Sequence, residues 1–429
     1  MSAWTFSGDN EANLMKIKYG KLIDKQFNKD NVILGRIKKM QDLIGSQIDR
    51  PLIQSIGGGV GSGSLPTANE NKIGKVILNV SKKLYAVVQI DRESMKRAKV
   101  SEGAFVSMTK YPVKIAVESF NRNLTRQILR NDIAGAGDLL TGNASNSTVS
   151  GTGASGDPYV VSFDVASTYF PAEFESVEEG DLLNVNTETT DLEVTAMTVT
   201  DASGYATGTI SLVGTSARLA ILADVVGCGA CPVAFGATDK LYIQGSKDNE
   251  IDGIKGVVAA TGGSYKNVTI GRRFQSYRKS AASASISTDL LNDLVINLKR
   301  KSGESPDMLL SSYHQFIKIL NLLEDQKSYN LPARDKKYKG QISFSGIEFM
   351  SADGAIPVIP DRFMDGDKVY ALNSNHIELH MTPGGFEWFD EDGTVFLRDA
   401  TDAYSARYGG YAELFVNPHF QGELHTLAV

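Results

Sequence analysis

The sequence has few of the residues on which metal-binding and redox motifs depend. Its 429 residues include only two cysteines, Cys228 and Cys231. Two cysteines cannot form a disulfide framework, so the chain is expected to fold in a reducing compartment. Their CxxC spacing supplies half of a structural zinc site, but the sequence has no second CxxC or CxxH pair. A plain turn is therefore a better interpretation than a metal or redox site.

The chain also lacks a long apolar run and an excess of positive charge. No stretch is long enough to span a bilayer, and the N-terminus lacks the basic-then-apolar order of a signal peptide, so no membrane partner is expected. The formal net charge of -6 argues against a protein that grips nucleic acid through its phosphates. Two short basic runs, 96–99 and 299–301, are expected on solvated helix ends, although they could meet packaged nucleic acid without reading its sequence.

The glycine-rich stretch 54–72 lacks the residues of a phosphate-binding loop. Gly58 and Gly63 have the required separation, but Ser64 and Leu65 follow where a lysine and a hydroxyl are needed. The dinucleotide pattern GxGxxG also fails in this stretch. Backbone freedom without charge remains, which is typical of a loop tip.

No other motif indicates catalysis or metal binding. The acidic run Asp390–Gly393 lacks the further ligands of a calcium loop and is better explained as a hairpin turn. His376 and His380 lie four residues apart in an expected strand, too far apart to share a metal ion. A GxSxG nucleophile elbow is absent. The sequence therefore predicts no enzyme, no cofactor and no metal site.

The composition, 42% hydrophobic and 22% charged residues, predicts a globular protein of more than one unit. Residues 1–48 are polar, with weak helical periodicity over 31–45. Two extended segments, 49–56 and 75–91, flank the glycine-rich stretch and predict a long hairpin. A lone two-stranded ribbon has no layer to cover its apolar face, so this arm needs a surface to lie on. We expect an adjacent copy to provide that surface.

The longest helical pattern covers residues 101–132. Ser101 can cap the helix, and Pro112 is expected to bend it by removing an internal hydrogen bond. Next come a Gly/Ser/Thr/Asn-rich linker and several short β-rich runs, which predict a small all-β insertion over 136–250. From 251 to 374, helices and strands alternate, including a clean helix over 287–303. Residues 375–429 are expected to form antiparallel strands.

This order of parts resembles the major capsid proteins of tailed bacteriophages, which share the Hong Kong 97-type capsid fold. The resemblance is carried by residues 75–98, the helix through Phe105–Ile128, 354–373 and the closing stretch 384–424. It implies an α+β fold with an N-terminal arm, an extended hairpin loop, a long spine helix, peripheral and axial domains, and an all-β insertion domain. The implied ranges are 1–48 for the arm, 49–91 for the loop, 92–135 and 375–429 for the peripheral domain, 136–250 for the insertion and 251–374 for the axial domain.

The same resemblance implies a function and a set of partners. The chain would assemble as hexamers and pentamers, in the host cytoplasm, into the icosahedral shell that encloses the double-stranded DNA genome. A separate scaffolding protein is expected, because few residues precede the hairpin; a portal and a decoration protein are further candidate partners. Intersubunit contact is expected at Gly57, Gly58, Gly59, Gly61, Gly63, Lys72 and Lys75. Some relatives cross-link this loop through lysine and asparagine, and here a partner asparagine is not identified.

Two alternatives stay open at the level of the sequence. An encapsulin-like compartment shares the fold and would differ in its cargo. A β-rich adhesin or carbohydrate-binding protein would explain residues 151–250, but it predicts exposed aromatic platforms, and that segment has few aromatic residues. An α/β hydrolase would need a nucleophile and a base, which the motifs above do not supply.

Overall fold

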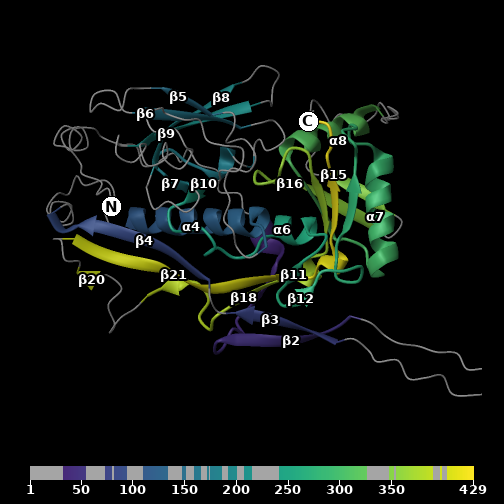
Figure 1. Cartoon of the computed structure of the whole chain (residues 1–429), viewed down its shortest axis with the longest axis horizontal. Coiled ribbons are helices and arrows are strands. Elements are labelled where there is room, and N and C mark those ends of the chain that lie inside the picture. Colours follow the sequence, from purple (N-terminus) through teal and green to yellow (C-terminus); the bar gives the residue numbers. More distant parts are fainter. Residues whose placement is uncertain are drawn as a thin grey trace, which may run out of the picture.

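The computed structural model describes residues 32–54, 73–79, 82–93, 110–133, 147–150, 159–165, 172, 174–185, 192–200, 207–214, 241–325, 347–351, 354–389, 397–398 and 403–429. Within these residues, the chain forms three six-stranded sheets and two two-stranded ribbons, together with helices that cover the sheets (Figure 1). This mixture is the α+β class that the sequence predicted.

The first sheet, here called the β14 sheet, is buried on both faces. Its strands are ordered β13 (Tyr277–Ser280), β22 (Gly422–His425), β17 (Val369–Leu372), β14 (Met308–Ser311), β16 (Gly354–Pro360) and β15 (Ile347–Ser351). Leu309 and Ala371 face a core that includes Leu294 of α7 (Thr288–Ser302), whereas Leu310 and Leu372 face the opposite core. Burial on both sides explains why β14 and β17 are apolar at almost every position.

Helix α7 forms as the sequence predicted. The Ser287 hydroxyl accepts a hydrogen bond from the Leu290 backbone N–H (3.3 Å), which caps the first turn. Gly303 ends the helix at φ 82°, a left-handed conformation that glycine adopts without a steric penalty. A buried stripe faces the sheet: Leu291, Leu294, Val295 and Leu298. Helix α8 (Tyr313–Asp325) follows β14 directly.

The second sheet is organised by one long strand, β21 (Ala403–Val416), and is here called the β21 sheet. Its first half pairs with β4 (Lys83–Asp91) on one side and with β19 (Glu387–Trp388) and β20 (Leu397–Arg398) on the other. Its second half pairs with β18 (Ile377–Met381), which lies parallel to β1 (Lys38–Met40). Helix α4 (Lys110–Arg130) runs along one face of this sheet (Figure 1). Leu84, Phe120 and Leu124 share its core.

The third sheet, here called the β8 sheet, consists entirely of residues between 147 and 243. Its order is β10 (Leu241–Ile243), β7 (Leu182–Val185), β8 (Leu192–Thr200), β9 (Thr207–Gly214), β6 (Tyr159–Val165) and β5 (Ser147–Ser150), all antiparallel. It lies on the side of α4 that faces away from the β21 sheet (Figure 1). The short helix η2 (Phe174–Ser176) lies between β6 and β7 in the chain. The predicted β-rich runs are strands; β5, inside the predicted linker, was not foreseen.

The end of α4 meets the β14 sheet through a short glycine-containing helix, α6 (Ile254–Ala259). A Cβ at Gly253 would lie 2.4 Å from the Asn131 carbonyl oxygen, and one at Gly256 would lie 2.3 Å from the Ile133 nitrogen. Glycine is therefore required at both positions for this close approach. A tight ribbon, β11 (Ser264–Tyr265) with β12 (Val268–Thr269), follows.

The structure corrects three expectations about strand membership. The extended segment 75–91 is two strands: β3 (Ile73–Asn79) pairs with β2 (Gln47–Ile53) in the hairpin, whereas β4 pairs with β21. The helical pattern over 31–45 is a short helix, α2 (Val32–Arg36), followed by β1. The last strand, β22, lies inside the β14 sheet rather than with the other strands of residues 375–429. In the first and third cases the pattern identifies an extended segment but not its partner; in the second it missed the strand β1.

Candidate assembly surfaces

The base of the β2–β3 hairpin packs on its own molecule. The register runs from the Gln47–Asn79 pair to the Ile53–Ile73 pair. Val76 and Leu78 are fully buried in the main core, and the Ile77 backbone N–H donates to the Lys266 carbonyl (3.0 Å). The expectation that the arm has no apolar backing within its own molecule is therefore wrong for the base. Figure 1 shows the hairpin projecting beyond the β21 sheet from this base.

A charged contact also fixes the base of the hairpin. The Arg50 guanidinium forms an ion pair with Glu378 of β18 and lies 5.3 Å from the centre of the Phe415 ring. His380 Nδ1 lies 2.7 Å from Asp42 Oδ1, and its Nε2 lies 3.4 Å from Glu378 Oε2. The Arg50–Glu378 pair therefore links strand β2 to the β21 sheet, and the His380–Asp42 contact links the loop after β1 to the same sheet.

The outermost described pair of the hairpin, here called its distal end, is apolar and exposed. Ile53 and Ile73 stand directly opposite each other, and their exposed fractions are 67% and 64%. Cross-strand neighbours of this kind form a single apolar patch. Such a patch gains stability only when another surface removes it from water.

A second exposed apolar patch lies on the outer face of β4. The strand alternates, so Leu84, Val88 and Ile90 are buried on the α4 side, whereas Tyr85 and Val87 face outward. Val87 is 63% exposed, and the Tyr85 ring centre lies 5.6 Å from that of Phe389. This outer face of the β21 sheet is thus partly apolar, unlike the polar face expected for a strand in contact with water.

Buried ion pairs hold α4 against the β14 sheet. Asp365 is buried in the turn between β16 and β17, with Arg130 (3.2 Å), Lys255 (3.0 Å) and Lys368 (3.0 Å) around its carboxylate. Burial alone would raise the pKa of Asp365, but the three cations outweigh it and hold the pKa well below its usual range. The carboxylate therefore stays charged and joins α4, α6 and the β16–β17 turn.

Two further buried carboxylates have cationic partners. Arg126 of α4 pairs with Glu250, and Asn123 Oδ1 accepts hydrogen bonds from the same guanidinium at 3.0 and 2.8 Å. Lys266 pairs with Asp252 (2.6 Å) and with Glu413 of β21. Burial raises the pKa of Glu413, and the Lys266 ammonium opposes that rise. These pairs make α4, the β21 sheet and residues 250–266 one body.

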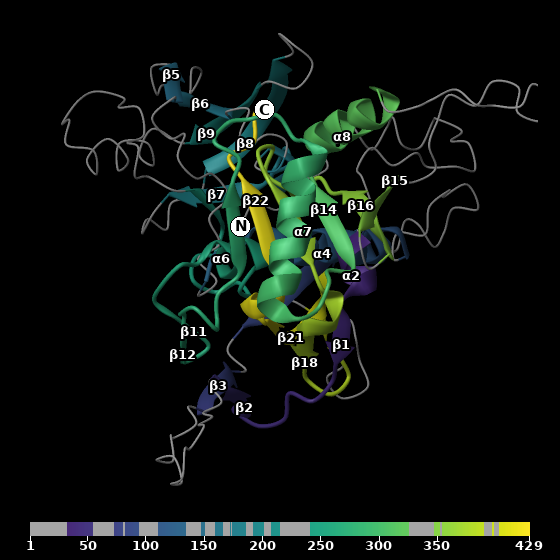
Figure 2. The same ribbon diagram turned by 90° about the vertical axis from the view of Figure 1, so that its right-hand side faces the viewer.

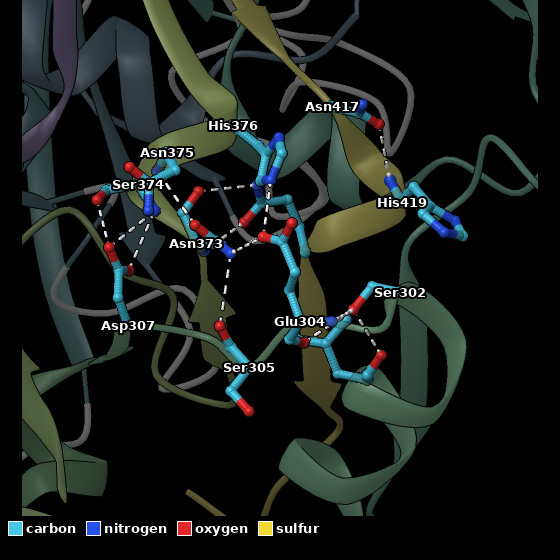
Figure 3. Close-up of polar contacts among 12 residues, drawn as sticks. Ser302, Glu304, Ser305, Asp307, Asn373, Ser374, Asn375, His376, Asn417 and His419 are labelled. Carbon is cyan, nitrogen blue, oxygen red and sulfur yellow. Dashed lines mark hydrogen bonds and ion pairs between the residues drawn. The ribbon is translucent and has the colours of Figure 1, made fainter. Parts of the chain in front are cut away.

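A polar cluster lies where the chain crosses between the β14 and β21 sheets (Figure 3). The backbone N–H of Asn373 donates to Gln421 Oε1 (2.9 Å), and the Gln421 amide donates back to the Asn373 carbonyl (3.3 Å). Glu304 accepts from the Asn373 amide (3.0 Å) and lies 2.9 Å from His376 Nε2. The His376 ring stacks on Phe420 of η4 (Pro418–Phe420), with centres 3.6 Å apart. The short helix η3 (Ser374–His376) thus joins both crossing segments.

Most of the predicted contact residues fall outside the described residues: Gly57, Gly58, Gly59, Gly61, Gly63 and Lys72. Lys75 is described, and its ammonium lies 2.5 Å from Asp49 Oδ2 on the neighbouring strand. Pro112 is the third residue of α4, where a proline removes no intrahelical hydrogen bond. A bend at Pro112 would therefore have to involve residues 101–109, which are also outside the described residues.

The CxxC pair and the acidic run singled out in the sequence cannot be placed in the structure either. Cys228, Cys231 and Asp390–Gly393 lie outside the described residues. Among the residues that are described, no group of three or more His, Cys, Asp or Glu side chains could hold a metal ion. No helix in the described part of the chain is long and apolar enough to cross a membrane.

Comparison with known structures shows the fold. The capsid asymmetric unit of cyanophage A-1(L) superposes with a TM-score of 0.55 at 10% identity, covering 99% of this chain and 100% of that one. The capsid of a native GTA particle gives 0.48 at 10% identity, with coverages of 99% and 100%. The holo-SrpI encapsulin from Synechococcus elongatus PCC 7942 gives 0.42 at 6% identity, with coverages of 99% and 96%. A search of curated protein sequences finds no match.

A family model adds sequence-level information to that likeness. Residues 237–394, which include most of the β14 sheet and the turn into β18, match the family of the SU10 major capsid protein. The chain therefore has the Hong Kong 97-type capsid fold, and part of it is similar in sequence to a phage major capsid protein family.

Sequence reasoning missed the apolar patches on the hairpin and on β4. It singled out the glycine-rich tip and two lysines, whereas the exposed apolar residues of the described chain include Ile53 and Ile73 on the hairpin and Tyr85 and Val87 on β4. A signal was present in the strand period. Tyr85 and Val87 occupy the same alternating positions as Lys83, Gln89 and Asp91, so large apolar side chains fall on the face that the charged residues mark as exposed.

Proposed function

We propose that the chain is the major capsid protein of a tailed phage and that its copies form the shell of the head. Neighbouring subunits of this shell hold one another through the β2–β3 hairpin, whose distal end lies across the outer face of β4 and β21 in the next subunit. The exposure gradient along the hairpin carries this proposal: the base residues Val76 and Leu78 are fully buried, whereas Ile53 and Ile73 are about two-thirds exposed. The base needs no neighbour. The distal pair does, and Tyr85 and Val87 offer an apolar surface to cover it.

We assign the three sheets to the domains that this arrangement requires. The β14 sheet with α7 and α8 is the axial domain, which surrounds the five-fold and six-fold positions of pentamers and hexamers. The β21 sheet with α4 as its spine helix is the peripheral domain. The β8 sheet is an insertion domain. Each contact can be modest in area, because many copies act together in a closed shell.

Other partners follow from the same proposal. A separate scaffolding protein, a portal and a decoration protein would meet this subunit during head assembly, and double-stranded DNA would fill the shell. These partners stay predictions, as does cross-linking through Lys72 or Lys75.

A pair of matched variants tests the arm contact. Ile53→Ser with Ile73→Ser removes the distal apolar patch, and Ile44→Ser removes an isoleucine of similar exposure (72%) from the loop after β1. The arm variant should fold normally by circular dichroism yet assemble poorly by light scattering and electron microscopy, whereas the Ile44 variant should assemble like the wild type. Equal assembly by both variants would contradict the proposal.

A disulfide cross-link tests which surface of the neighbouring subunit the hairpin contacts. With Cys228 and Cys231 replaced by Ser, Ile73→Cys and Val87→Cys are introduced together. Oxidised shells should give a ladder of covalent multimers on a non-reducing gel, and unassembled protein should not. A monomer band alone, from shells that otherwise assemble normally, would place the arm elsewhere.

A further inference from the structure

Positive charge is concentrated in one part of this acidic protein. Residues 271–303 contain seven Lys and Arg but only two Asp, against a net charge of -6 for the whole chain. These residues form a turn, strand β13 and helix α7. The excess of positive charge in this segment is opposite in sign to the net charge of the chain. The net charge therefore does not predict whether this part of the surface attracts anions.

Several of these cations already have partners. Arg278 Nε lies 2.6 Å from Glu423, and Lys279 Nζ lies 3.0 Å from Asp293. Lys301 donates to the carbonyls of Gln275 (2.6 Å) and Ser276 (2.8 Å). Lys301 is partly buried, which lowers its pKa to about 8, and these two contacts hold its ammonium against residues 275–276.

Four cations of this segment have exposed side chains: Arg272, Arg273, Lys299 and Arg300. We call them the basic ridge. Arg272 and Arg273 lie in a turn that the Phe274 N–H closes on the Gly271 carbonyl (2.8 Å), and Lys299 and Arg300 lie in the last turn of α7. The Lys301 contacts with Gln275 and Ser276 bring the end of α7 against the segment that follows the turn. Figure 2 looks directly onto α7, which lies on the viewer's side of the β14 sheet.

Acidic residues near the ridge are already engaged. Glu304, just beyond α7, is bound to Asn373 and His376, and Asp293 is bound to Lys279. Burial lowers the pKa of His419, and the positive charges of Lys301 and Arg273 lower it further. Cations near a helix C-terminus interact favourably with its dipole, which accounts for residues 299–301 but not for Arg272 and Arg273.

We infer that the basic ridge binds the phosphate backbone of duplex DNA without reading its sequence. A duplex carries about one negative charge per 1.7 Å of axis, so a compact group of exposed arginines and lysines can contact several phosphates at once. A protein partner is disfavoured, because stable protein interfaces have an apolar or aromatic centre and the ridge residues offer none. The identity of the anion as DNA rests on the proposed function, whereas the charge of the ridge does not.

The test is fluorescence anisotropy with a labelled 30-base-pair duplex and full-length unassembled protein over a range of salt concentrations. Arg272→Gln, Arg273→Gln and Arg300→Gln are combined in one variant. The control combines Lys39→Gln, Lys83→Gln and Lys114→Gln, which removes the same charge from exposed positions elsewhere. The ridge variant should bind at least about tenfold more weakly near 0.1 M salt, and its slope of log K against log salt should be shallower by about 2.7. The control should change both quantities far less.

Two outcomes would overturn the inference. Equal weakening in both variants would mean that total charge governs binding, and unchanged binding in the ridge variant would exclude the ridge. If the ridge variant keeps its DNA affinity but fails to assemble, the ridge contacts another protein subunit instead. Light scattering on the same variants separates this result from the arm proposal: a shell that forms normally while DNA affinity falls supports the ridge whether or not the hairpin contact is correct.

Discussion

The β14 sheet and the distal hairpin represent two ways of covering apolar strands. In the β14 sheet, Leu309 and Leu310 point to opposite faces, and both are fully buried by helices and strands of the same chain. In the hairpin, Ile53 and Ile73 are just as apolar, but nothing in the described part of the chain covers them. The difference shows that hydrophobic pattern identifies a surface that needs cover, while the source of that cover is a property of topology and assembly.

The largest expected effect is predicted for Asp365, the buried carboxylate that joins α4 and α6 to the β14 sheet. Asp365→Asn would leave Arg130, Lys255 and Lys368 without their shared negative charge in a buried site. Removing one partner of a buried ion pair costs about 3–5 kcal/mol. Denaturant unfolding of the unassembled chain should show this loss. Asp293→Asn, which breaks the more exposed contact with Lys279, should cost far less.

The stability difference between the wild type and Asp365→Asn should also depend on pH. The folded-state pKa of Asp365 is lowered from an unfolded value of about 3.9, so its contribution is complete above that value and is lost as the pH falls towards the lowered pKa. The stability gap between the wild type and Asp365→Asn should therefore stay constant from about pH 7 to pH 5 and narrow below about pH 4. A gap that does not change with pH would show that the carboxylate is not the charged partner.

Truncation of one leucine and one isoleucine sharpens the comparison directly. Leu294→Ala removes a fully buried side chain between α7 and the β14 sheet and should cost about 2–5 kcal/mol of unfolding free energy. Ile53→Ala should change the unfolding free energy of the unassembled chain by less than about 0.5 kcal/mol. Assembly kinetics should rank the two differently, because Ile53 is expected to matter only when a neighbour is present. A similar unfolding cost for both would mean that the hairpin end is covered within one subunit.

Local chemistry in the sequence was enough to predict several elements. Ser287, the spacing of Leu291, Leu294 and Leu298, and Gly303 define α7 from cap to stop, because a helix is stabilised by neighbours within a few residues. The strands were found for a similar reason. Their period is local, and the resemblance to phage capsid proteins supplied the fold that holds them.

Pairing and buried charge could not be predicted in this way. Strand β4 pairs with β21, more than 300 residues later, and its alternation would be the same beside β2. Asp365 resembles the other acidic residues in the sequence, and only the fold brings Arg130 and Lys255 to it. The exposed patches were missed because an isoleucine on a strand shows the same pattern whether its cover comes from its own chain or from another.

The smallest expected effect concerns a buried arginine beside the β14 sheet whose guanidinium is only partly hydrogen-bonded. Arg362, in the β16–β17 turn, is 5% exposed and lies over the Phe363 ring at 4.6 Å, yet its Nε and Nη2 atoms have no hydrogen-bond partner among the described residues. Burial, and then the positive charge of Arg122, lowers the pKa of Arg362. A buried guanidinium without full pairing is costly, so Arg362→Met should leave the unfolding free energy unchanged or raise it by about 1 kcal/mol.

Arg126→Met is the matched control: it should lower the unfolding free energy by about 3–5 kcal/mol, because Glu250 would stay buried without its partner. If both variants lose stability equally, Arg362 has a partner in the folded subunit, and the contrast between a paired and an unpaired buried arginine fails.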